Sequence, residues 1–133
     1  MFIAKLTPEK QEVFLNLAYT MVYADGRLDD REQRLLDGYR IESAVDMSKV
    51  HKVDFENELA KLEDCTTVEK QCIFLELYAI ALIDESYPEE EKILVETVKK
   101  HFNISAEKIA AMHEAFVNFI DAYKKLHAVV TTE

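Results

Sequence analysis

The side chains with the clearest capacity for chemistry are carboxylates, which occur in two similar groups along the chain. Each group holds three acids within a stretch of eight residues. The first group is Asp25, Asp30 and Glu32, and the second is Asp84, Glu89 and Glu91. Carboxylate oxygens are the ligands that Ca²⁺ and Mg²⁺ prefer in proteins. The spacing therefore predicts candidate sites for a divalent cation, with Ca²⁺ or Mg²⁺ favoured.

Helix capping is the competing explanation for several of these acids. Asp29 with Glu32 has the spacing of a capping box, and the acidic run 89–91 suits the positive start of a helix. Asp25 and Asp84 differ, because each follows the carboxyl end of an apolar helix, where the helix dipole disfavours negative charge. Either a turn that the Asp side chain closes or a bound cation would compensate this cost. Neither loop is an EF-hand, since glycine immediately follows Asp25 instead of standing sixth in the loop.

The two acidic groups belong to a longer internal match. Residues 19–32 align with residues 78–91 without a gap, so that an apolar run, a loop and an acidic start follow in the same order. Such a match indicates a duplicated helical hairpin, with repeat halves at about 8–42 and 67–102. The alternative is chance similarity, since any two amphipathic hairpins with acidic starts would share much of this pattern. Each hairpin has an apolar face that it cannot bury alone, so we expect the two hairpins to pack together.

Helical periodicity and capping signals define the elements that position these acids. We expect helices over about 8–24, 30–41, 67–83 and 88–102, with one or two further helical pieces between 44 and 62. A closing helix over about 105–127 has apolar residues at steps of three and four, which predicts one buried face, and residues after His127 read as a frayed tail. The sequence thus predicts an all-α fold, a compact bundle of about six to seven helices forming one domain over 1–133.

Composition narrows the function further. The chain has 133 residues, a net charge of −10 and only two glycines and two prolines. This acidity argues against nucleic-acid binding, which needs clustered basic residues. The start of the chain lacks the apolar region of a signal peptide, and the longest apolar run, 72–83, is too short for a membrane span. We therefore expect a cytoplasmic protein that does not insert into membranes.

The sequence contains no recognisable catalytic motif. It has no glycine-rich phosphate loop, no nucleophile elbow and no HExxH pair, and Cys65 and Cys72 have neither zinc-site nor disulfide-framework spacing. His51 with Asp54 and Glu56 is a weak candidate ligand cluster. We predict that the protein is not an enzyme. A small hydrolase using paired carboxylates is a third interpretation, which requires a deep pocket joining the two acidic groups.

The stretch Ala24–Glu32, echoed by Asp84–Glu91, resembles the TerB-like family of bacterial proteins associated with tellurite resistance and stress. The resemblance covers about half the chain at the level of motifs. It implies an all-helical fold whose acidic positions bind a metal cation, with Asp25, Asp30 and Glu32 as one set and Asp84, Glu89 and Glu91 as the other. The second half departs from the pattern, because Glu85 stands where glycine is expected and Pro88 enters the loop.

Two functional interpretations follow from these residues. In the first, the protein is a cation-responsive module whose occupied acidic loops fix the hairpins and present a surface to a protein partner in a stress response. In the second, it is a metal-free interaction scaffold in which the acids serve only as helix caps. The sequence specifies neither the partner nor the oligomeric state.

Overall fold

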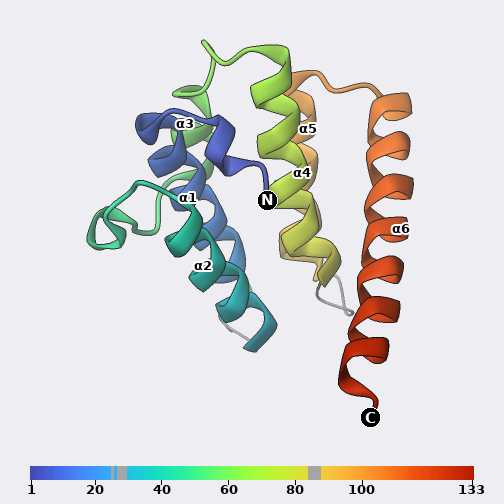
Figure 1. Cartoon of the computed structure of the whole chain (residues 1–133). Helices are drawn as coiled ribbons and strands as arrows, with labels where there is room; N and C mark the ends of the chain where they lie inside the picture. Colours follow the sequence, from blue (N-terminus) through green and yellow to red (C-terminus); the bar gives the residue numbers. More distant parts are fainter. Residues whose placement is uncertain (25, 27–29, 84–87) are drawn as a thin grey trace. The chain divides into compact units, whose positions relative to one another are not determined.

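A computed structural model of the chain describes residues 1–24, 26, 30–83 and 88–133. Within these residues every regular element is helical, and no strand occurs. The α-helices are α1 (Pro8–Val22), α2 (Asp30–Glu42), α3 (Phe55–Ala60), α4 (Thr67–Ile83), α5 (Glu89–Phe102) and α6 (Ala106–Thr131), and the short 3-10 helices are η1 (Ile3–Lys5) and η2 (Met47–Lys49). The predicted all-α helical bundle is therefore confirmed (Figure 1).

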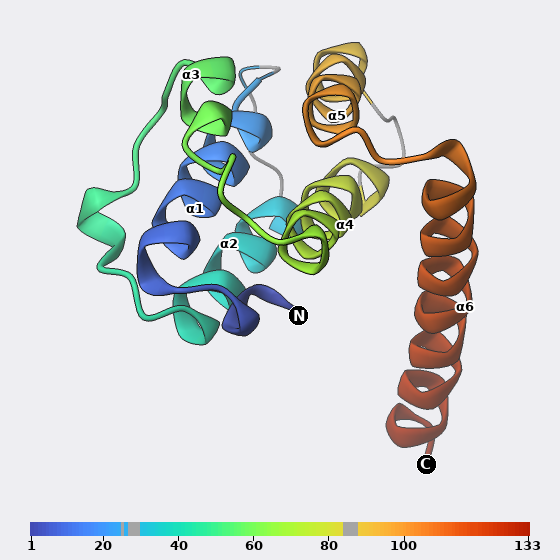
Figure 2. The ribbon, with the colours of Figure 1, turned by 90° about the horizontal axis from the view of Figure 1, so that it is seen from above.

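The described residues form two compact units, Met1–Asn103 and Ile104–Glu133. The first unit contains α1 to α5 and the second contains α6. In the first unit α4 contacts α1, α2, α5 and η1, so it occupies the middle of the bundle (Figure 2). This position agrees with its nearly all-apolar sequence, because a helix that is apolar on most sides needs neighbours on most sides.

The start of α4 shows how the local sequence fixes a helix boundary. The Thr66 backbone amide donates to Oε1 of Glu69 at 3.0 Å, and the Glu69 amide donates to Oγ1 of Thr66 at 3.1 Å. This reciprocal pair is a capping box, which satisfies two amides that the first helical turn leaves without partners. At the starts of α1 and α6, the side chains of Thr7 and Ser105 likewise accept the backbone amides of Lys10 and Lys108, without the reciprocal bond from a glutamate.

The two predicted hairpins bury the same positions of their sequences. Residues 59 positions apart correspond in the predicted repeat, and six such pairs of α1 and α4 are buried in both helices. The pairs are Phe14 and Ile73, Leu15 and Phe74, Leu17 and Glu76, Ala18 and Leu77, Met21 and Ile80, and Val22 and Ala81. The hairpins therefore share an inward face as well as a sequence pattern, which supports the predicted duplication.

Helices α1 and α4 run in the same direction through the first unit (Figure 1). The carboxyl ends of α1 and α4 consequently lie at the same end of this unit as the amino ends of α2 and α5. The acidic starts of α2 and α5 are thus directed to one end of the bundle, a point that the sequence did not settle.

The stretch between residues 44 and 62 contains two short helical pieces, as expected, but it is not helical throughout. Regular helix occurs at η2 and α3, and the intervening chain is irregular. Asp46 accepts a hydrogen bond from the Ser48 amide, and Asp54 accepts one from the Asn57 amide. Each aspartate therefore begins a new short helix, because its side chain competes with the backbone carbonyls that would extend a helix through it.

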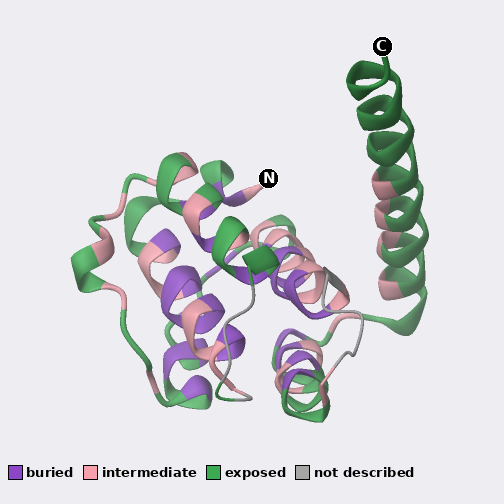
Figure 3. Cartoon of the chain, turned by 90° about the horizontal axis from the view of Figure 1, so that it is seen from below, coloured by how far each residue is buried: buried purple, intermediate pink, exposed green. Residues whose placement is uncertain are grey.

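Helix α6 differs from its prediction at its carboxyl end. It continues to Thr131, so the expected frayed tail after His127 is wrong; the hydroxyls of Thr131 and Thr132 donate to the carbonyls of His127 and Ala128. Within its own unit α6 buries no side chain, and the buried face expected for this helix stays a prediction (Figure 3). Among the described residues, no helix combines the length and the apolar character needed to cross a bilayer.

Candidate functional site

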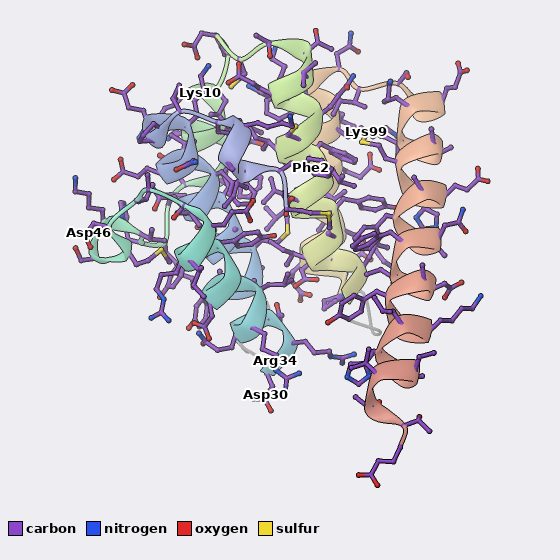
Figure 4. All side chains as sticks on the ribbon, viewed as in Figure 1. Phe2, Lys10, Asp30, Arg34, Asp46 and Lys99 are labelled. Atoms are coloured by element: carbon purple, nitrogen blue, oxygen red, sulfur yellow. The ribbon has the colours of Figure 1, made fainter. Side chains whose placement is uncertain are left out.

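The first acidic group lies at the start of α2. Asp30 is the first residue of this helix and is exposed, near Arg34 (Figure 4), whereas Glu32 is buried with only 2% of its surface exposed. The buried residues of α2 are Glu32, Leu36 and Tyr39, which stand four and three positions apart and so share one face of the helix. Glu32 therefore occupies a core position, where an apolar side chain would be expected.

The second acidic group repeats this arrangement at the start of α5. Glu89 is the first residue of the helix and is exposed, whereas Glu91 is 1% exposed. The buried face of α5 contains Glu91, Val95 and Val98, which have the same spacing as the buried residues of α2. Each lies 59 positions after its counterpart in α2, which is the offset of the repeat. Two equivalent carboxylates are thus buried at equivalent points of the two hairpins.

Burial of a carboxylate has a physical cost. Transfer of an ionised carboxyl group from water costs several kcal/mol unless hydrogen bonds or an opposite charge compensate it. Glu32 and Glu91 are each the third residue of a helix, where backbone amides and the helix dipole favour an anion. Both the capping and the cation interpretations therefore remain consistent with these two positions.

The structure bears on only part of the predicted ligand sets. Asp25 and Asp84 lie outside the described residues. Of the other four acids, Glu32 and Glu91 are buried and Asp30 and Glu89 are exposed. Within the described parts of the chain, no group of three or more His, Cys, Asp or Glu side chains is arranged to hold a metal ion. The described acids alone do not form a complete cation site, although their oxygen donors suit a hard cation.

A third buried acid, Glu76 of α4, organises a polar cluster that the sequence did not single out. Its Oε1 accepts the Phe2 backbone amide at 2.7 Å and lies 3.0 Å from the ammonium group of Met1, and its Oε2 accepts the Tyr39 hydroxyl at 3.1 Å. Glu42 also accepts from the Met1 ammonium, at 2.8 Å. The signal was present in the repeat, because Glu76 replaces the apolar Leu17 of the first hairpin.

The Glu76 cluster raises the pKa of two of its members, Tyr39 and the Met1 ammonium. Burial raises the pKa of Tyr39 well above its ordinary value, and the charge of Glu76 raises it further. Burial lowers the pKa of the Met1 ammonium, but the hydrogen bonds to Glu42 and Glu76, together with their charges, raise it overall. The cluster ties η1 and the chain start to α2 and α4, and this arrangement indicates a structural role.

The weak candidate cluster at His51, Asp54 and Glu56 has structural partners instead. The His51 ring nitrogen Nδ1 lies 2.9 Å from the Lys49 carbonyl, and Asp54 caps α3. Buried Asn16 of α1 accepts from the His51 backbone amide at 3.0 Å and donates to Oε2 of Glu58 at 2.8 Å. These contacts fasten the irregular segment to α1, and Lys61 balances the charge of Glu58 through an ion pair.

An open depression of about 280 Å³ lies on α5. Its lining residues are Glu89, Lys92, Ile93, Glu96, Thr97 and Lys100. All of them belong to one helix, and neither Glu32 nor Glu91 is among them. This depression does not join the two acidic groups, as the paired-carboxylate hydrolase would require.

Comparison with known proteins provides no assignment. No protein family, no curated protein and no solved structure matches the chain. The resemblance of residues 24–32 and 84–91 to the TerB-like family therefore stays a prediction from the sequence, and the functional argument rests on the residues themselves.

Proposed function

We propose that this chain is a non-enzymatic acidic helical module that binds a divalent cation, Ca²⁺ or Mg²⁺, at the starts of α2 and α5 and acts through a protein partner. The observation that carries this proposal is the burial of Glu32 and Glu91 at equivalent positions of two similar hairpins. One buried acid can be an accident of packing. The same acid at the same place twice suggests that it has a shared role.

The chemistry of these positions supports a hard cation. Each buried glutamate follows an exposed acid two residues earlier, Asp30 before Glu32 and Glu89 before Glu91. Asp25 and Asp84 would complete the two ligand sets in the predicted repeat. A cation bound to Glu32 or Glu91 would offset the desolvation of that buried carboxylate.

The arrangement of the helices supports a coupling between cation and partner. Because α1 and α4 are parallel, both acidic helix starts belong to the same end of the first unit (Figure 1). Ions at both starts would fix the angle between the helices of each hairpin. A role in a bacterial stress response, and a cytoplasmic location, belong to the proposal through the resemblance to the TerB-like family.

A metal-free interaction scaffold is the alternative, and a specific observation favours it. The pair Thr66 and Glu69 forms a complete capping box at the start of α4, so this chain does use a glutamate at the third helical position as a cap. Glu32 and Glu91 occupy the corresponding positions of α2 and α5. In this interpretation they stabilise helix starts and bind no ion.

Calorimetric titration with Ca²⁺, Mg²⁺, Mn²⁺ and Zn²⁺ separates the two functions. We expect saturable heat from Ca²⁺ or Mg²⁺ with the wild-type chain, and a loss of affinity of at least about tenfold in the Glu32→Gln/Glu91→Gln variant and in the Asp25→Asn/Asp84→Asn variant. The neighbouring exposed Glu90→Gln change is the matched control and should leave binding intact. Absence of heat and of thermal shift with all four ions would leave the scaffold as the function.

A further inference from the structure

The chain between α2 and α3 runs beside α1 as an irregular segment, residues 44–53, which we call the strap (Figure 2). Its regular structure is the single turn of η2. Within the first unit none of the side chains of the strap is buried. Its larger apolar side chains are half-buried, and they are Val45, Met47, Val50 and Val53. The strap therefore contributes little to the apolar core of this unit.

Three backbone amides attach the strap to side-chain oxygens of α1, at donor–acceptor distances of 2.9, 3.0 and 3.1 Å. The pairs are Ala44 with Gln11, His51 with Asn16, and Val53 with Thr20. Among the residues that the structure describes, no backbone amide of the strap donates to a backbone carbonyl outside it. The attachment through hydrogen bonds thus depends on individual side chains of α1.

Asn16 and Thr20 form the centre of this attachment. They stand four residues apart on α1, and the Thr20 hydroxyl that accepts the Val53 amide also donates to the Asn16 carbonyl at 2.8 Å. The Asn16 carboxamide accepts the His51 amide and donates to Oε2 of buried Glu58 at 2.8 Å. Two neighbouring side chains therefore join the strap to α1 and to α3.

The side chains of α1 that hold the strap are polar ones that water can satisfy. Gln11 and Asn16 are 5% and 4% exposed, and their amide oxygens accept backbone amides of the strap. If the strap lifts, water replaces each strap amide, so these oxygens keep a hydrogen bond. The strap also regains the conformational freedom that its attachment removes. Lifting the strap should therefore cost less than unfolding a helix such as α3, which would expose the fully buried Leu59.

We propose that the strap is a reversible lid on α1. It lifts as one unit while α1 to α5 stay folded, and it then uncovers the side-chain oxygens of Gln11, Asn16 and Thr20. The closed strap occupies these acceptors with its own backbone amides, so the lid controls access to this side of α1. This inference goes beyond the proposed function and requires neither a bound cation nor a partner.

Native-state hydrogen exchange of the full chain, followed for each amide by NMR, tests the lid. The amides of Ala44, His51 and Val53 should be protected to the same degree, and at least about tenfold less than the amide of Leu77 in the central helix α4. Low concentrations of urea should speed the exchange of Leu77 and leave the strap amides nearly unchanged, because a local opening exposes little surface. Strap amides that exchange as slowly as Leu77, with the same dependence on urea, would overturn the inference.

The variant Thr20→Val tests whether the strap lifts as one unit. It removes the oxygen that accepts the Val53 amide and leaves a side chain of similar shape. The exchange of Ala44 and His51 should then speed by about threefold to tenfold together with that of Val53, because loss of one hydrogen bond favours the open state of the whole strap. A change confined to Val53 would show that the residues of the strap open independently and would refute the lid.

The matched control is Thr97→Val in α5. The Thr97 hydroxyl donates to the Ile93 carbonyl at 2.9 Å, four residues earlier, as the Thr20 hydroxyl does to the Asn16 carbonyl. Thr97→Val therefore removes the same kind of contact within a helix, on an element that makes none of the three bonds to the strap. The strap amides should keep their wild-type exchange rates in this variant. Equal acceleration in both threonine variants would contradict the lid.

Discussion

Glu32 of α2 and Glu91 of α5 occupy the same position in two copies of one pattern. Each is the third residue of its helix, each is buried, and in each helix the residues four and seven positions further on are buried as well. In α2 these followers are Leu36 and Tyr39, and in α5 they are Val95 and Val98. The two glutamates therefore belong to the buried faces of their helices, whereas the exposed first residues, Asp30 and Glu89, do not.

Two phenylalanines that differ in exposure, Phe74 and Phe119, predict unequal costs for the same truncation. Phe74→Ala removes a ring that is 1% exposed in the core and should lower the free energy of unfolding by about 3–5 kcal/mol. Phe119→Ala removes a ring that is 48% exposed and should cost less than about 1 kcal/mol. Urea unfolding of both variants measures the difference. Equal costs would mean that Phe119 is covered in the free protein.

The ion pairs of the Met1 ammonium with Glu42 and Glu76 predict that the folded chain loses stability at alkaline pH. Its pKa is raised in the folded chain, so its contribution is fully present below the unfolded pKa and is lost as pH rises through the folded pKa. The loss should be less than about 1 kcal/mol, since this ion pair is partly exposed. Thermal melts between pH 7 and 10 should show a shallower fall for Glu76→Gln than for the wild type. Parallel curves would contradict the role of this pair.

The buried hydrogen bond from Asn16 to Glu58 predicts that a nearly isosteric substitution of Asn16 lowers the free energy of unfolding strongly. Asn16→Asp replaces the amide that donates to Glu58 with a carboxylate, which places two acids together in a buried site. The loss of a buried hydrogen bond costs about 1–3 kcal/mol, and like charges add to it. Chemical denaturation measures this loss of stability. The control is Asn118→Asp, at an exposed position of α6, which should change the free energy of unfolding by less than about 0.5 kcal/mol.

The capping box of α4 predicts a difference between adjacent threonines. Thr66→Ala removes the hydroxyl that accepts the Glu69 amide and should cost about 0.5–2 kcal/mol. Thr67→Ala alters the next residue, which is exposed and is the first of the helix, and should change stability little. Urea midpoints of the two variants test the assignment, and similar midpoints would show that the cap contributes nothing.

Much of the fold was predictable because short-range signals determine it. Thr7 with Pro8, Thr66 with Glu69, and Ser105 mark helix starts through hydrogen bonds made within three residues. The repeat was visible for the same reason, since the match of residues 19–32 to 78–91 reflects equal patterns of apolar spacing. In the structure, residues at corresponding positions of α1 and α4 are buried in both helices.

The remaining features depend on contacts between distant residues. Periodicity shows which side of α6 is apolar, but the spacing of apolar residues does not specify which other residues pack against that side. The segment after α2 is held by Asn16 of α1, which no local pattern indicates. Glu76 lies within the apolar run 72–83, and no local pattern indicates that it contacts the Met1 ammonium and the Tyr39 hydroxyl.

Paramagnetic broadening by Mn²⁺ in amide NMR spectra tests the central claim most directly, because it reports which residues approach the ion. At substoichiometric Mn²⁺, the account predicts selective loss of the amide signals of Glu32 and Glu91, reversed by excess Ca²⁺ or Mg²⁺, while those of the exposed acids Glu107 and Glu114 on α6 persist. Uniform weak broadening of all acidic surfaces, with Glu32 and Glu91 no more affected than Glu114, would contradict it.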